Sequence, residues 1–205
     1  MSMQKINKFR ITQTLLGDWL WAYKLDGGYE KFLKTLRREK EPPTKAMLDG
    51  QHFEGMVNAA LDGHSIDDKH EWAEQVKECA NILRGSQKQV VLFKEITVDG
   101  VRFLLHGVLD FLRCGVIYDT KFSKTYKRAE IASKYMSSPQ HPMYFALVPE
   151  AYEFRYLICD GEYIYEERYR PEDVKPIEQT IREFMQFLEL HGLIEIYTEK
   201  WRVKS

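Results

Sequence analysis

The sequence predicts a mixed α/β fold in which helices flank a central, mostly antiparallel mixed sheet. Three observations lead to this class. Apolar residues recur with helical spacing before residue 85, runs rich in β-branched and aromatic residues follow up to residue 122, and helical and strand patterns then occur again. With 205 residues, 44% of them hydrophobic, the chain is long enough to bury one core, so we expect a single domain over 1–205.

Residues 1–43 are expected to form a helical preamble, which Pro42 and Pro43 bring to an end. In the expected core, 44–160, an amphipathic helix is predicted with Glu54 at the edge of its apolar stripe. That stripe consists of Phe53, Met56, Val57, Ala60 and Leu61. A second helix is predicted from Trp72, Val76, Cys79 and Leu83. Gly85 should end it.

Three strands are expected next, with the sequences QVVLFKEITV, VRFLLHGVLDFL and VIYDTKF. Asp99-Gly100 between the first two is a strong hairpin signal, and Cys114-Gly115 between the last two is a weaker one. Residues 125–147 return to helical composition. Two more strands are predicted around Asp160-Gly161, so 161–205 should supply a C-terminal strand and a helix over about 172–190.

Two aspartates in the apolar runs on either side of Cys114-Gly115 indicate a site. If those two residues form the turn, Asp110 faces Asp119 across the strands, at a separation where like charges repel. The period of two places Lys121 on the same face as Asp119. Two interpretations stay open: Lys121 neutralises one aspartate while the other reaches solvent, or a cation binds between the carboxylates.

The overall charge excludes a strong field toward nucleic acid or anionic membranes, because 30 Lys and Arg balance 31 Asp and Glu. A polyanion site must therefore be local. The N-terminus does not resemble a secretory signal, and apolar runs are too short to cross a bilayer, so we expect a soluble cytoplasmic protein without membrane contact. Cys79, Cys114 and Cys159 are too widely spaced to indicate a disulfide framework or a zinc site.

Four short motifs occur in order along the core. They are Gly50-x-x-x-Glu54 on a helix, Asp110 at the end of a strand, Asp119-Thr120-Lys121 on the next strand, and Gln140-x-x-x-Tyr144 on the following helix. This set resembles the PD-(D/E)XK nuclease superfamily, in particular its RecB-like and lambda-exonuclease-like branch. The resemblance covers residues 44–160 and implies a restriction-endonuclease-like core.

The resemblance also implies a site for Mg²⁺ or Mn²⁺. Its ligands would be Asp110, Asp119 and the backbone carbonyl of Thr120, with Glu54 bound directly or through water. Oxygen ligands of this kind suit hard cations. The catalytic set implied is Glu54, Asp110, Asp119 and Lys121, where Lys121 would orient the attacking water and offset charge on the phosphorus.

DNA contacts are expected at two places. Gln140 and Tyr144 resemble the branch's Q-x-x-x-Y motif, which is associated with DNA binding near the site. Lys121, Lys124, Lys127, Arg128 and Lys134 fall within fourteen residues that contain one acid, directly after the proposed catalytic strand. Such a run is often a solvated helix face, but here it lies where a phosphate backbone would pass.

The chain departs from its relatives in three respects. Glu54 stands where many RecB-like members carry His, which indicates an all-oxygen ligand set. The cysteine cluster of the iron–sulfur members is absent, so we expect neither an iron–sulfur cluster nor a nucleotide cofactor. Pro142 falls inside the Q-x-x-x-Y segment, which requires Pro139 to Pro142 to form the first helical turn.

His106 is either a ligand or base of the site or a structural residue.

The leading hypothesis is a Mg²⁺- or Mn²⁺-dependent deoxyribonuclease, an exonuclease of recombination, repair, or a phage or mobile element. One alternative is a nucleic-acid-binding subunit of the same fold without catalysis. Another is a structural protein in which Lys121 and the aspartates form an ordinary network. Single- or double-stranded DNA, a homo-oligomer and a recombination partner protein all stay open as partners.

Overall fold

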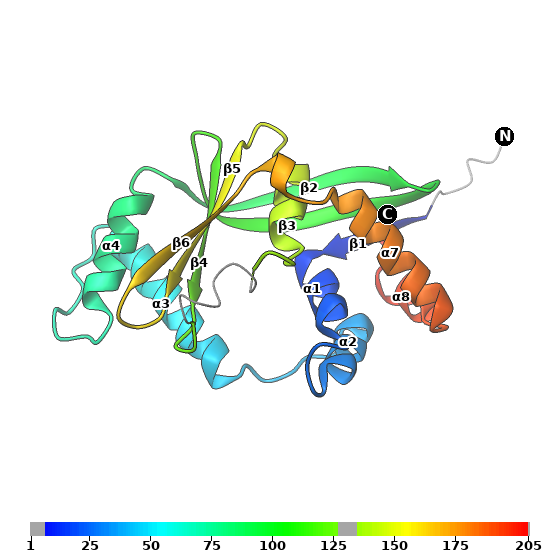
Figure 1. The fold of residues 1–205 in the computed structure, drawn as a ribbon, viewed down its shortest axis with the longest axis horizontal. Helices are drawn as coiled ribbons and strands as arrows, with labels where there is room; N and C mark the ends of the chain where they lie inside the picture. The colour runs from blue at the N-terminus through cyan, green and yellow to red at the C-terminus, as the bar shows by residue number, and fades with distance from the viewer. Residues whose placement is uncertain (1–6, 127–134, 205) are drawn as a thin grey trace.

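The computed structural model describes residues 7–126 and 135–204, and it has a mixed sheet flanked by helices (Figure 1). In Figure 1, α3 and α4 lie at one end of the molecule and α1, α2, α7 and α8 at the other, with the strands between them. The elements are β1 (Lys8–Thr12), α1 (Gln13–Trp21), α2 (Gly28–Arg37), α3 (Lys45–Leu61), α4 (Ala73–Leu83), β2 (Gln87–Val98), β3 (Val101–Arg113), β4 (Val116–Phe122), α6 (Gln140–Leu147), β5 (Glu153–Cys159), β6 (Ile164–Tyr169), a 3-10 turn (Pro171–Asp173), α7 (Ile177–Leu190) and α8 (Ile194–Lys200).

The long strand β3 organises the sheet. β2 pairs antiparallel with β3 over nearly the whole length of both strands. β1 pairs parallel with the first half of β3, and β4 pairs antiparallel with its last residues, so these two share the other edge of β3. β5 pairs parallel with β4, and β6 antiparallel with β5. The sheet is therefore mixed, and its two parallel pairings are both non-local.

The two expected hairpins have the expected turns. Asp99 and Gly100 have φ values of 48° and 80°, and Cys114 and Gly115 have φ values of 48° and 77°. Positive φ at both central residues is typical of the type I′ turn, whose twist matches that of paired strands. Arg113 faces Val116 across the second turn, which confirms the register that the two-residue turn predicts.

Two local expectations need correction. Residues 8–12, expected to be helical, form strand β1, because Phe9 and Ile11 point into the core while Lys8, Arg10 and Thr12 alternate with them. The last long helix begins at Ile177 and not near 172, because Pro176 disfavours helical backbone at the residue before it. The short helix α8 was not predicted.

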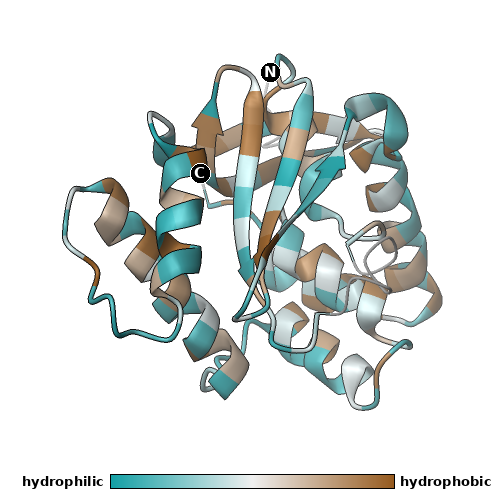
Figure 2. Ribbon diagram, turned by 60° about the vertical axis from the view of Figure 1, so that its left-hand side comes forward, coloured by the Kyte–Doolittle hydropathy of each residue, from teal (hydrophilic) through white to brown (hydrophobic). Residues whose placement is uncertain are grey.

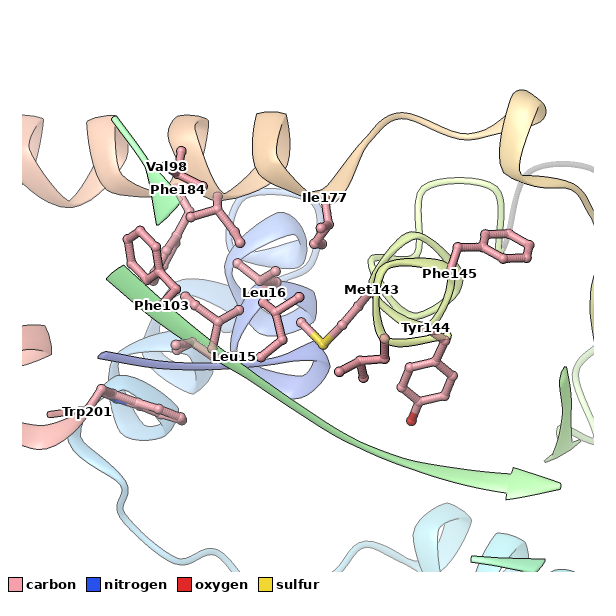
Figure 3. Close-up of a cluster of buried hydrophobic side chains, with 14 of the residues drawn as sticks. Leu15, Leu16, Val98, Phe103, Met143, Tyr144, Phe145, Ile177, Phe184 and Trp201 are labelled. Carbon is pink, nitrogen blue, oxygen red and sulfur yellow. The ribbon is translucent and has the colours of Figure 1, made fainter. Parts of the chain in front are cut away.

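The buried side chains form two clusters. The larger lies between the β1–β3–β2 part of the sheet and α1, α6 and α7; Figure 3 shows Leu15, Met143 and Phe184 converging beside Phe103 of β3. The smaller lies between α3, α4 and the β4–β5 strands, and it contains the expected stripes of both helices. Figure 2 shows brown and teal residues in succession along strands, as expected where one face of a strand is buried.

Candidate active site

The strand ladders on both sides of β3 are interrupted at Asp110. The β2–β3 ladder pairs Lys88 with Phe111 and Val90 with Leu109, but it skips the step between them, where Gln89 faces Asp110. On the other edge, the β3–β4 ladder ends at the pair formed by Phe111 and Tyr118, one step short of Asp110 and Asp119. Asp110 therefore lies at an interruption of the sheet, where side chains from neighbouring elements can converge.

Asp119 has two partners at this interruption. The side-chain amide of Gln140 donates a hydrogen bond to its Oδ1. Its Oδ2 lies 2.6 Å from Nζ of Lys121, an ion pair without hydrogen-bond geometry, and in the described residues this oxygen accepts no hydrogen bond. Asp119 is only 2% exposed, whereas the Lys121 side chain is 30% exposed. The expected proximity of Lys121 to Asp119 is thus confirmed.

The electrostatics show that the carboxylates repel one another. Burial, then repulsion from Asp119 and Glu54, raises the pKa of Asp110 from 3.8 to about 8, and Lys121 offsets this only in part. Burial also raises the pKa of Glu54, with repulsion from Asp119 adding to it. Burial opposes the charge of Lys121, but the three carboxylates outweigh it and raise the pKa of Lys121. In neutral solution without a cation, Asp110 keeps its proton.

Gln89 is a site residue that the sequence reasoning missed. Its φ of 50° lies in the left-handed region, which is unfavourable for a residue with a Cβ atom. From that position its amide nitrogen donates a hydrogen bond to Glu54 Oε1 at 3.0 Å, and so links β2 to α3 beside Asp110. A strained backbone that the surrounding structure maintains is often found at functional sites.

The Q-x-x-x-Y helix packs closely against β3. A Cβ atom added to Gly107 would lie 2.7 Å from Leu147 and 2.8 Å from Tyr144, so the helix can approach only because residue 107 is glycine. The hydroxyl of Tyr144 donates a 2.7 Å hydrogen bond to the carbonyl of Val108, and Figure 3 shows its ring pointing away from α6. Pro142 lies in the first turn of the helix, as expected.

Gln140 and Tyr144 are both buried. The contacts just described give them positioning roles, Gln140 for Asp119 and Tyr144 for the part of β3 that lies between its pairings with β1 and β4. Direct contact of either residue with DNA stays a prediction.

The remaining candidates lie apart from the carboxylates or outside the described residues. Lys124 stands over the Trp72 ring at 5.3 Å and 4.0 Å from Glu71. Lys127 and Arg128 lie outside the described residues. His106 stacks on Phe93, with ring centroids 4.5 Å apart and planes 10° apart, which fits the structural alternative for this histidine.

The acidic side chains that act on Asp110 are Asp119 and Glu54, and the metal ligands they offer are carboxylate oxygens. Within the described residues, no group of three or more His, Cys, Asp or Glu side chains is placed to hold a metal ion. Glu54 Oε1 accepts the hydrogen bond from Gln89, and the expected ligand set of Asp110, Asp119, the Thr120 carbonyl and Glu54 stays a prediction. Beside Lys121 and Gln140, a cleft of about 370 Å³ opens toward Gln13, Thr14 and Trp21 of α1.

Comparison with known protein families gives no match, and neither does comparison with curated proteins. Among solved structures, the crystal structure of SSO0001 is similar over 87% of this chain and 75% of that chain, with a TM-score of 0.49 and 16% sequence identity. A search of the described helices finds none with the length and apolar character that crossing a membrane requires.

Proposed function

We propose that this chain hydrolyses phosphodiester bonds in DNA with the help of Mg²⁺ or Mn²⁺, as an exonuclease. One observation supports this above the others. The interruption of the sheet brings together Asp110 and Asp119 at the cost of their mutual repulsion, and it places Lys121 beside them. A carboxyl group whose pKa is strongly perturbed, as that of Asp110 is, occurs preferentially at functional sites.

A small divalent cation fits the donors present. In the described residues, Asp119 Oδ2 is buried 2.6 Å from Lys121 Nζ and accepts no hydrogen bond, and Asp110 retains a proton that a cation would displace. Mg²⁺ usually binds one or two carboxylates and keeps several waters, so two aspartates and the Thr120 carbonyl would suffice to hold it. When bound, such an ion polarises the phosphate and lowers the pKa of an attacking water.

The side chains around the carboxylates would then have separate roles. Lys121 is charged and partly exposed, so it can hold a phosphate oxygen and stabilise the negative charge that develops in the transition state. Gln140 fixes the rotamer of Asp119. Glu54, held by Gln89, has a pKa raised by burial and by the charge of Asp119, which suits a group that takes up or releases a proton.

The structural alternative has one observation in its favour, the ion pair between Lys121 and Asp119. It does not explain Asp110, whose pKa is raised to about 8 although Lys121 offsets part of the repulsion. A protein in which this cluster served stability alone would gain from a residue without a carboxyl group at that position. The alternative of a subunit that binds DNA without cleaving it retains the site but predicts no product.

The test is cleavage of linear and circular DNA, single- and double-stranded, in Mg²⁺, in Mn²⁺ and in chelator. We expect shortening of linear DNA that requires the cation and is absent in Asp119→Asn, a change that preserves shape and the acceptor for Gln140. Lys77→Ala serves as a control, because Lys77 lies on α4 and pairs with Asp68 and Glu74 instead of with the site. DNA that stays intact in every condition, or is cut equally well in chelator, would refute the proposal.

A further inference from the structure

One face of the β1–β3–β2 part of the sheet carries exposed apolar and aromatic side chains. This open face consists of Lys8, Arg10 and Thr12 from β1, Leu104, His106 and Val108 from β3, and Val91, Phe93 and Glu95 from β2. Helices α1, α6 and α7 pack on the opposite face. Val91 and Phe93, two residues apart on the same face of β2, are each 55% exposed, which is unusual for neighbouring large apolar side chains.

The open face begins at a basic cleft. Arg10 lines a cleft of about 490 Å³ together with Arg38, Lys200, Arg202 and Lys204, and Glu199 is the acid that lines it. The Arg38 guanidinium is held in place, 4.8 Å over the Trp201 ring and hydrogen-bonded to the Lys200 carbonyl. On the open face itself, Glu95 is neutralised by an ion pair with Lys8. A cluster of cations on a chain without overall positive charge is complementary to a polyanion.

The aromatic pair Phe93 and His106 lies next along this face. Phe93 stacks on His106 and, being more than half exposed, leaves ring surface for another planar group. Burial and the charge of Arg10 lower the pKa of His106, so the imidazole is neutral at physiological pH and acts as an aromatic surface. Planar bases stack on such platforms without regard to sequence.

The distance along β3 from the Arg10 cleft to Asp110 is short. Arg10 faces Leu104, and Asp110 lies six residues further along β3, about 20 Å at ~3.3 Å per residue. Between them lie His106 and Val108, with Phe93 alongside. This order of cations, aromatic platform and carboxylates suits a nucleic-acid strand whose phosphates and bases are both accessible.

We propose that the open face is a track for single-stranded nucleic acid, which runs from the Arg10 cleft over Phe93 to Asp110. The end of the track at Asp110 rests on the proposed function, whereas binding along it does not. A duplex hides its base faces and cannot use Phe93, so single strands are preferred. A second copy of this chain is disfavoured as the occupant because it would bring another basic cleft to the same surface.

The test is binding of a fluorescent twenty-residue oligothymidine, and of a duplex of equal length, in chelator so that no cleavage occurs. Phe93→Ala should weaken single-strand binding about tenfold, the effect of one lost base stack, with little effect on the duplex. Arg10→Ala combined with Arg202→Ala should weaken binding and reduce its salt dependence by roughly one counterion or more. Phe93→Leu, which keeps the apolar volume, should behave like Phe93→Ala.

Two control variants accompany the binding test, and its outcomes separate failure of the track from failure of the proposed function. Tyr163→Ala removes an exposed aromatic ring at the β5–β6 end, and Lys175→Ala removes an exposed cation; neither should alter binding. Unchanged single-strand affinity in both Phe93 variants, or a change in oligomeric state instead of binding, overturns the track. If cation-dependent cleavage persists with that result, the proposed function survives. If binding falls as expected but no cleavage is found, the track survives and the nuclease proposal fails.

Discussion

Replacing Asp110 with Asn should stabilise the protein in chelator, by an amount that depends on pH. The folded protein holds a proton on Asp110 up to about pH 8, whereas the unfolded chain releases it near pH 3.8. Between these values the folded state binds more protons than the unfolded state, so wild-type stability falls as pH rises, and it levels off above pH 8. The Asn variant lacks this titration, so its advantage should be small at pH 4 and largest at pH 8.

The size of this stabilisation follows from the shift in the pKa of Asp110. At ~1.4 kcal/mol per pKa unit, the full displacement corresponds to an upper limit of roughly 6 kcal/mol, and relaxation and water reduce it to about 2 kcal/mol at pH 7. Urea unfolding in chelator between pH 4 and pH 8 measures it, with Asp26→Asn, an exposed change between α1 and α2, as the control. Saturating Mn²⁺ should stabilise the wild type and leave the Asp110 variant almost unchanged.

A lower stability of the Asp110 variant in chelator, or an advantage that does not vary with pH, would refute this reasoning. Either result would mean that the Asp110 carboxylate is well compensated in the folded protein. The structural network would then be the better account of the cluster.

Further predictions concern the residues around the carboxylates. Gln89→Gly should be about 1 kcal/mol more stable than Gln89→Ala in urea unfolding, because both lose the bond to Glu54 and only glycine relieves the positive φ. Gln140→Ala should lower stability by about 1–3 kcal/mol in the same assay, because Asp119 Oδ1 is left buried without its donor. Gly107→Ala should cost about 1–3 kcal/mol by pushing α6 from the sheet, and a wild-type melting temperature would contradict that close packing.

The parts of the fold that local chemistry determines could be predicted. The turn at Cys114 and Gly115 sets the register of its two strands as far as Phe111 and Tyr118, and the next step of that register brings Asp110 and Asp119 together, with Lys121 beside Asp119. The helix stripes likewise follow from the period of 3.6 residues. These features depend on residues close together in sequence.

Pairings between distant segments could not be predicted in the same way. The parallel pairing of β4 with β5 has no local signal, because any extended apolar segment can add to a sheet edge. The alternation of Phe9 and Ile11 with polar residues could have indicated β1, but a five-residue pattern is weak evidence. The role of Gln89 depends on a positive φ, which nothing in the identity of glutamine suggests.

The central claim is that Lys121 and the two aspartates form a cation-dependent hydrolytic site. The most direct measurement is the single-turnover rate of DNA cleavage in Mn²⁺ at saturating enzyme, compared between wild type, Lys121→Ala and the Lys77→Ala control, each verified as folded by circular dichroism. We predict a loss of about a hundredfold or more for Lys121→Ala, the usual effect of removing one group that stabilises transition-state charge, and an unchanged control. A Lys121→Ala protein that cleaves at the wild-type rate would contradict the account.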